Sequence, residues 1–318
     1  MGDAIDLLCR ADNPASQKYH RAYTSIPTID NADPGPCVVV AFFHLLLDVP
    51  QASPLPNRFL GYLLGNGLPF VLVPMVEAYR YKGKQHWLLS WPTFWLLMTQ
   101  VATMGFVLPV YFLLALMTRG QGGGCSEDDK YTVSGEKKVE ALTFGLAIGA
   151  GLPSLAMIYL NDAFATWIWQ FYPILVVSLR YVYLHFRSKN TNTNSAISQH
   201  KTPKILRVLY LTCFLVASLT HGFFVWPLIR RGKFRSMYDL LVPLPVSALD
   251  TMVHPSILVH NFLKWDYALS AASTLIAMLW SAGSVEQVGY MILWYALAIP
   301  VLGPGAACMG VLVWQNLM

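Results

Sequence analysis

The stretch 205–227, ILRVLYLTCFLVASLTHGFFVWP, is long and apolar enough to decide the fold class. Its one formally charged side chain is Arg207. An α-helix needs about 20 mostly apolar residues to cross the hydrocarbon core of a bilayer, and this stretch is long enough. Because lipid offers no hydrogen-bond partners to the backbone, such a stretch predicts a transmembrane helix.

Further apolar stretches predict an all-α, polytopic transmembrane bundle of seven or eight spans. Besides 205–227, the candidate spans are 36–49, 58–79, 87–117, 139–160, 163–186, 266–282 and 288–315. The three prolines of 240–262 predict a broken or re-entrant segment. Residues 1–35 are polar, so we expect a polar N-terminal segment followed by one transmembrane helical domain over 36–318.

The composition and the charge pattern agree with a membrane protein. Charged residues make up 12% of the chain, against about 25% in soluble proteins. Basic residues gather at 80–84, 187–204 and 230–235, and the positive-inside rule favours the cytoplasmic side for such loops. With these spans, however, 187–204 falls opposite the other two loops, and an error in one span is one explanation for this conflict. No basic stripe with interleaved aromatic residues predicts a nucleic-acid partner.

The cysteines and histidines give no metal-binding pattern. The cysteines are scattered without a CxxC pair, so we expect isolated buried thiols: Cys9, Cys37, Cys125, Cys213 and Cys308. A metal site from Asp250, His254 and His260 lacks any supporting signature such as HExxH, and we expect none. His44 and Asp48 share a helix face and are expected to form a buried hydrogen-bonded pair.

Three carboxyl groups near span ends are the candidate catalytic residues. Glu77 follows a long apolar stretch and shares a helix face with Asn66 and Phe70. Burial there would favour a protonated carboxyl group, which suits a proton donor. The alternative is that Glu77 lies at headgroup depth and pairs with Arg80 or Lys84.

Asp266 and Asp162 are the other two candidates. Asp266 opens the expected span 266–282 and shares a face with Trp280, and its alternative role is an N-terminal helix cap. Asp162 lies in a tight turn, with Trp169 on its face, and a turn and cap would explain it equally well. With these spans, the three carboxyl groups emerge on one membrane side and are expected to converge on one cavity.

Aromatic residues are dense near the span ends, where Trp and Tyr favour the membrane interface. Some of them are candidates to line a cavity, because aromatic faces stabilise cationic charge. The predicted substrate-binding residues are Asn66, Phe70, Trp169, Trp265, Tyr267 and Trp280. A GxSxG motif, a P-loop and a paired Asp-rich motif for a prenyl diphosphate are all missing from the sequence. Ionisation of a diphosphate is therefore disfavoured, whereas protonation of an apolar substrate stays open.

Three stretches carry a resemblance to a known family. They are HNFLKWDYALSAASTLIAMLW at 260–280, VPMVEAYR at 73–80 and YLNDAFATWIWQFYPI at 159–174. The chain resembles the fungal membrane-bound terpene cyclases of meroterpenoid biosynthesis, of the ascofuranone and macrophorin type. Length, number of spans and the polar N-terminus agree with that resemblance over most of the chain.

The resemblance implies an enzyme of the endoplasmic reticulum membrane that needs no metal or organic cofactor. Its substrate would be a farnesyl chain on an aromatic or polyketide-derived head group. An acid would protonate an epoxide or a terminal alkene, and a carbocation cascade would close the rings. Carried onto this sequence, the acid is Glu77 or Asp266, with Asp162 as a hydrogen-bonding partner or base.

Other classes of function remain open at this point. Intramembrane carboxyl groups also mark proton-coupled transporters of small metabolites. A non-enzymatic scaffold that associates with other pathway enzymes would use the same carboxyl groups as helix caps. A double-bond isomerase would share the acid–base chemistry and differ in its product.

Overall fold

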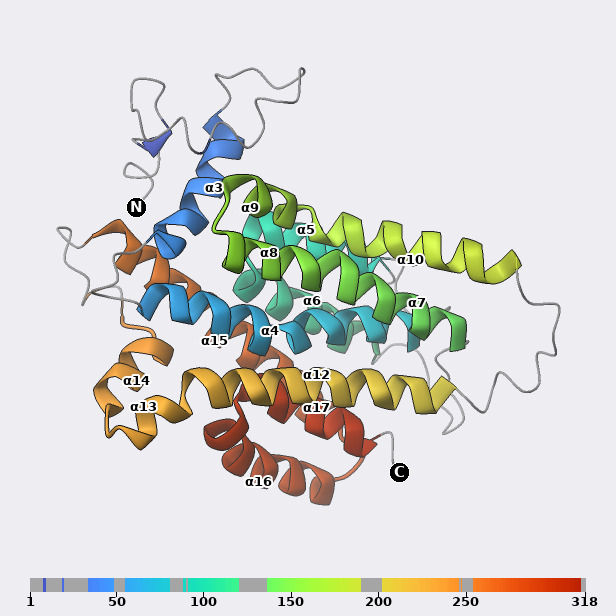
Figure 1. Ribbon diagram of the computed structural model, residues 1–318. Helices are drawn as coiled ribbons and strands as arrows, with labels where there is room; N and C mark the ends of the chain where they lie inside the picture. Colours follow the sequence, from blue (N-terminus) through green and yellow to red (C-terminus); the bar gives the residue numbers. More distant parts are fainter. Residues whose placement is uncertain are drawn as a thin grey trace.

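The computed structural model describes residues 8–9, 19, 34–48, 55–80, 88–89, 91–119, 136–189, 202–245, 247 and 254–315. Over these ranges the regular structure is entirely helical, as expected (Figure 1). The helices are α3 (Pro34–Leu47), α4 (Leu55–Arg80), α5 (Pro92–Ala102), α6 (Met104–Arg119), α7 (Glu136–Leu146), the π-helical turn η2 (Ala147–Gly151), α8 (Leu152–Leu160), α9 (Ala163–Gln170), α10 (Tyr172–Lys189), α12 (Thr202–Phe224), α13 (Trp226–Arg230), α14 (Phe234–Leu241), α15 (Pro255–Trp280), α16 (Val285–Leu302) and α17 (Pro304–Gln315).

Four helical stretches are long and apolar enough to cross a membrane, so the chain is membrane-associated. They are Leu55–Ala78, Lys137–Leu160, Ile205–Arg230 and Val285–Leu302. Each overlaps one of the expected spans. Two shorter apolar helices, Cys37–Leu47 and Met104–Thr118, overlap two further expected spans. The total of seven or eight spans stays a prediction.

The expected span 87–117 is wrong as a single helix. Helices α5 and α6 form a hairpin that turns at Thr103, since the rings of Trp95 and Tyr111 lie 5.4 Å apart. One continuous helix would separate these two residues by about 24 Å. The chain therefore returns to the end of the bundle from which it came.

This hairpin changes the expected sidedness of the loops. In Figure 1 the C-terminal ends of α4 and α10 and the N-terminal ends of α7 and α12 lie together at the right. The end of α4 at Arg80 and the end of α10 at Lys189 therefore lie on one side, contrary to the expected spans. Helices α13 and α14, which flank the basic stretch 230–235, lie at the left. Residues 81–84 and 190–201 lie outside the described residues.

The C-terminal part of the chain differs from the expected spans in two ways. The expected span 288–315 is broken at Gly303 into α16 and α17, and the Trp294 indole N–H donates to the carbonyl of Ala307 across this second hairpin, at 2.9 Å. Helix α15 begins at Pro255, well before the expected start, so Asp266 lies inside the helix and is not its cap. The predicted break in 240–262 is confirmed between α14 and α15.

The cysteines are only partly as expected. Cys213 and Cys308 are buried thiols, as predicted. Cys9 and Cys37, however, form a disulfide that ties the N-terminal segment to α3. Spacing alone does not reveal this pair, because the partners are 28 residues apart. Cys125 lies outside the described residues.

Candidate functional site

A cavity of about 340 Å³ lies between α3, α4, the α5–α6 turn, α8, α9 and α15, and we call it the chamber. Such a volume is at the lower end of the range for small-molecule sites. Aliphatic and aromatic side chains from α3, α4 and α15 form one side of it: Val38, Val39, Phe42, Phe43, Leu63, Leu64, Leu68, Val71, Phe262 and Leu263. This side suits a hydrocarbon ligand.

The opposite side of the chamber carries polar groups on α5, α9 and α10. Thr99 and Gln100 of α5 and Tyr172 of α10 line the chamber. Gln170 also lines the chamber, and its amide nitrogen lies 3.4 Å from the carbonyl of Thr166. The chamber is therefore amphipathic, with hydrocarbon on one side and amide and phenol groups on the other.

Asp266 is the one acidic residue among those that line the chamber. Its carboxyl group accepts a hydrogen bond from the backbone N–H of Gly105. Gly105 lies at the start of α6, directly after the chain reverses at Thr103, and we call this segment the first turn (Thr103–Gly105). The first turn therefore fixes the carboxyl group at the chamber wall.

The first turn fits closely against α15. A Cβ atom on Gly105 would lie 2.6 Å from the backbone oxygen of Asp266 and 2.8 Å from its Cα. Thr103 has φ 67° and ψ 154°, a backbone conformation that is essentially confined to glycine. Close approach at Gly105 and backbone strain at Thr103 thus both occur in the turn that fixes Asp266.

Neighbours of Asp266 on α15 hold the helix against the chain that follows α14. The Trp265 indole N–H donates to the carbonyl of Leu244 at 2.9 Å, and the Lys264 ammonium donates to two backbone carbonyls near the end of α14. Trp265 lies outside the set that lines the chamber. In the Trp265–Asp266 pair, the tryptophan anchors the helix and the aspartate reaches the chamber.

Asn66, Phe70 and Tyr267 belong to a buried cluster beside the second hairpin. The Asn66 side-chain oxygen accepts from the Tyr267 hydroxyl at 2.6 Å and from the backbone N–H of Gly305 at 2.9 Å. Phe70 packs on Tyr267, with ring centroids 5.7 Å apart. The three predicted substrate-binding residues lie outside the chamber lining, and their contacts hold helices together.

Trp169 and Trp280 have opposite environments. Trp169 lines the chamber, and its indole N–H donates to Ser154 at 2.9 Å. Trp280 lies at the end of α15 and is 74% exposed. Each of these tryptophans was predicted to bind substrate because it shares a helix face with a candidate carboxyl group. Only Trp169 lies at the chamber.

Glu77 lies far from the chamber, near the C-terminal end of α4. It borders a separate space of about 40 Å³, together with Ser281 and Gln315, where α15 and α17 also end. That volume holds little more than one water molecule. The structure therefore does not place Glu77 beside Asp266.

Asp162 caps the N-terminus of α9, as its alternative role predicted. Its side chain accepts from the backbone N–H groups of Phe164 and Ala165, at 3.0 and 3.2 Å. The preceding Asn161 ends α8 in the left-handed conformation. Asp162 lies at the end of the bundle where α4 begins, about 30 Å from Glu77 along the axis of α4. The expected convergence of three carboxyl groups on one cavity is therefore wrong.

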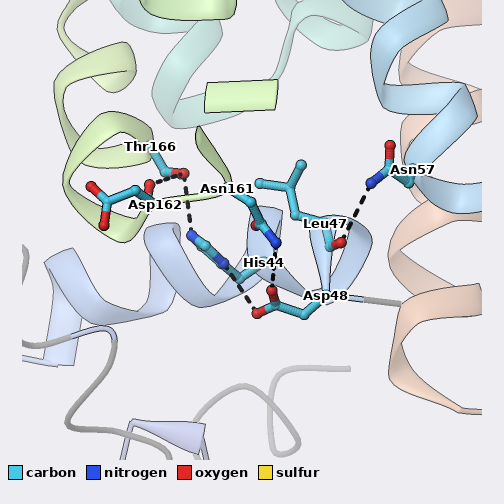
Figure 2. A network of polar contacts seen from close by, with 7 residues as sticks. All are labelled: His44, Leu47, Asp48, Asn57, Asn161, Asp162 and Thr166. Atoms are coloured by element: carbon cyan, nitrogen blue, oxygen red, sulfur yellow. Dashed lines mark hydrogen bonds and ion pairs between the residues drawn. The ribbon is translucent and has the colours of Figure 1, made fainter. Parts of the chain in front are cut away.

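A polar network next to Asp162 joins α3 to α9 (Figure 2). His44 contacts Asp48 at 3.1 Å through Nδ1 and the Thr166 hydroxyl at 3.3 Å through Nε2. Asn161 donates to the other carboxylate oxygen of Asp48 at 3.1 Å. The predicted hydrogen bond between His44 and Asp48 is confirmed, but only His44 is buried, since Asp48 is exposed. The network fixes α3, whose other face lines the chamber.

Several chamber residues were not identified from the sequence, namely Thr99, Gln100, Thr103 and Tyr172. Thr103 lies within an apolar stretch and carries no recognisable signal. Among the described residues, no group of three or more His, Cys, Asp or Glu side chains is placed to hold a metal ion. Asp250 lies outside the described residues.

Comparison with known proteins places the chain in a family. A family model described as the CtvD domain matches residues 9–315. The chain belongs to the CtvD-domain family. The family name is tied to a fungal biosynthetic pathway, which makes the chain a biosynthetic protein of secondary metabolism. No match was found among the curated proteins or the solved structures that were searched.

Proposed function

We propose that the chain is a membrane-bound terpene cyclase that acts on a farnesylated aromatic or polyketide-derived substrate in the endoplasmic reticulum membrane. The observation that carries this proposal is the position of Asp266 in the wall of an apolar, aromatic-lined chamber. An uncharged carboxylic acid is far less costly to bury there than a carboxylate. Asp266 at rest therefore holds the proton that the reaction needs.

The reaction begins when Asp266 transfers this proton to an epoxide oxygen or to the end carbon of a terminal alkene. The electron-deficient carbon is attacked by a neighbouring double bond, which closes a ring and moves the positive charge along the chain. Loss of a proton to a base ends the cascade, so that the whole reaction is an isomerisation without net redox change. Aromatic side chains such as Phe43 and Trp169 stabilise the intermediate cations.

The first turn supports the acid role of Asp266. Its donor, the Gly105 N–H, stabilises the carboxylate that remains after proton transfer. The apolar side of the chamber accommodates the isoprenoid chain and keeps water from the cation. A farnesyl chain is itself apolar, so the surrounding lipid is a plausible source of the substrate.

The test is turnover of a farnesylated phenol and of its terminal epoxide by microsomes that contain the protein. We expect Asp266→Asn to lower turnover by about 10²–10⁴-fold, the usual contribution of a positioned acid. Glu77→Gln and Asp162→Asn are the matched controls, because they neutralise carboxyl groups outside the chamber. Full turnover by Asp266→Asn, or an equal loss in all three variants, would contradict the assignment.

A further inference from the structure

Helices α13 and α14 form a sharp bend at the end of the bundle where α4 begins (Figure 1). Gly232 joins them with φ 63°, and the Lys233 N–H donates to the carbonyl of Leu228 at 2.9 Å across the turn. A glycine in this conformation is a usual end for a helix. The bend brings four basic residues together, and we call them the cationic cluster: Arg230, Arg231, Lys233 and Arg235.

The ends of apolar helices place the cationic cluster at the depth of the lipid headgroups. The apolar stretch Ile205–Arg230, which is long enough to cross a membrane, ends at the first residue of the cluster. The Trp226 indole N–H donates to the carbonyl of Val301 at 3.0 Å, so the stretch Val285–Leu302 ends beside it. A helix that crosses a bilayer ends where the hydrocarbon core meets the headgroups.

Contacts from α15 hold α14 and the chain that follows it in place. The Lys264 ammonium donates to the carbonyls of Asp239 and Val242, at 3.0 and 2.8 Å. The Asn261 side chain accepts from the backbone N–H of Leu244 at 2.7 Å and donates to its carbonyl at 3.0 Å. The backbone beside the cationic cluster is therefore fixed, which lowers the entropic cost of binding a ligand there.

The described part of the chain does not neutralise the cationic cluster. All four side chains are exposed, and none forms an ion pair with a described residue. Asp239 is the one acidic residue in 226–242, and it forms no ion pair with Arg235 one helical turn before it. The dipole of α14 also disfavours cations such as Lys233 and Arg235 at its N-terminal end.

Two aromatic side chains of α14 are exposed next to the cationic cluster. Phe234 is 59% exposed and Tyr238 is 51% exposed, and the two share a helix face because they are four residues apart. Aromatic side chains favour the membrane interface. Basic residues beside exposed aromatic ones are typical of helices that lie in the headgroup region of anionic membranes.

We propose that the cationic cluster, together with Phe234 and Tyr238, binds anionic phospholipids of the surrounding membrane. The guanidinium and ammonium groups donate to the phosphate and carboxylate oxygens of the headgroup, and the two aromatic rings contact the start of the acyl chains. Each basic residue at an anionic membrane surface strengthens binding by about fivefold. This binding does not depend on the reaction that the chamber carries out.

The test is native mass spectrometry of the detergent-solubilised protein with phosphatidylserine and with phosphatidylcholine of the same acyl chains. We expect the wild type to bind phosphatidylserine at least about 10-fold more tightly. Arg230→Gln, Arg231→Gln, Lys233→Gln and Arg235→Gln combined should abolish this preference and leave phosphatidylcholine binding unchanged. Arg230→Lys, Arg231→Lys and Arg235→Lys combined keep the charge and should keep the preference. A wild type without the preference, or a glutamine variant that retains it, would overturn the proposal.

Two controls test where the lipid binds and what is recognised. Lys137→Gln, Lys138→Gln and Arg187→Gln combined remove cations from the opposite end of the bundle and should keep the preference. A loss as large as in the four-residue glutamine variant would show a general charge effect and overturn the proposal. Inorganic phosphate should raise the unfolding temperature less than phosphatidylserine at equal concentration, because it lacks acyl chains. Equal stabilisation by the two would overturn the choice of a lipid as the ligand.

Thermal unfolding without added lipid shows that each variant is folded. All the substituted side chains of the cationic cluster are exposed, so we expect these variants to unfold within a few degrees of the wild type. Because no substrate is used, loss of the phosphatidylserine preference and loss of cyclase turnover are separate results. A protein that binds phosphatidylserine at the cluster but turns over no farnesylated substrate would support this proposal and contradict only the proposed function.

Discussion

The two hairpins of this protein solve the same structural problem with different chemistry. Each reverses the chain at one residue with positive φ, and each directs a glycine N–H two residues later at a side-chain oxygen on a 26-residue helix. In the second hairpin this oxygen belongs to the amide of Asn66 on α4. In the first it belongs to the carboxyl group of Asp266 on α15, and the chamber lies beside it.

The comparison shows that the turn itself does not require an acid. Asn66 accepts the glycine N–H, and its own amide nitrogen donates to the carbonyl of Ala217 at 2.9 Å, so that a neutral side chain holds this hairpin. A carboxyl group at the corresponding place of the first hairpin is more costly to bury. We therefore infer that the acid at Asp266 serves the proposed reaction, whereas the geometry that both hairpins share serves to reverse the chain.

The largest difference should come from exchanging amide and acid between the hairpins. Asn66→Asp places a carboxylate in a fully buried site opposite the Ala217 carbonyl, and we expect the free energy of unfolding to fall by about 3–5 kcal/mol. Asp266→Asn should change it by less than about 1 kcal/mol, because the amide oxygen still accepts the Gly105 N–H. Unfolding of both variants in the same detergent measures the difference, and equal changes would break the comparison.

The next largest effect is expected for Gly303→Thr in the turn between α16 and α17, which we call the second turn (Gly303–Gly305), because this change gives it the residue found at Thr103 in the first turn. Its Cβ would lie 2.6 Å from the Asn66 amide nitrogen and 2.8 Å from the His221 ring, and the backbone would be strained. We expect a loss of about 2–4 kcal/mol in the free energy of unfolding. Thermal unfolding tests this. A variant as stable as the wild type would contradict the expected clash of the new side chain with Asn66 and His221.

Gly105→Ala should have a smaller effect on stability and a marked effect on turnover. The new methyl group would press on the backbone of Asp266, which costs about 1–3 kcal/mol and displaces the carboxyl group. Gly289→Ala on α16 is the matched control, since a Cβ there meets nothing within 4 Å. We expect that control to keep both stability and turnover, and a loss in both variants would point to a general intolerance of alanine.

The smallest effect is expected for Thr103→Gly, and its sign is opposite to that of Gly303→Thr. Relief of the backbone strain outweighs the greater freedom of glycine in the unfolded chain, so that the free energy of unfolding should rise by about 1 kcal/mol. Calorimetry of the purified protein tests this, and a clear loss of stability would remove the argument for strain.

The sequence predicts the helical membrane fold well and the hairpins poorly. Apolar length identifies the four long helices, because hydropathy adds up over about 20 residues. Both hairpin turns lie inside apolar stretches, so hydropathy added over about 20 residues does not reveal either turn. The Gly303-Pro304-Gly305 run is a chain-breaking signal that identifies the second turn in retrospect. The first turn has only Gly105 near it, and its strained residue is a threonine.

The candidate site was predictable only in part. Asp266 and Trp169 stand out as an acid and an aromatic residue in otherwise apolar surroundings, and both line the chamber. Glu77 has the same appearance in the sequence but lies at the far end of α4, away from the chamber. Its position relative to Asp266 depends on the directions of α4 and α15 in the bundle, which the sequence does not fix. The contact of Gly105 with Asp266 joins residues 161 positions apart, which no local pattern predicts.

The disulfide between Cys9 and Cys37 has a practical consequence for preparing the protein. It fastens the N-terminal segment to α3, and the other face of α3 forms part of the chamber. Reducing agents such as dithiothreitol open disulfides of this kind, and bacterial cytosol does not form them. Extraction buffers free of thiols, and a eukaryotic secretory host, are therefore the conditions under which an intact chamber should be sought.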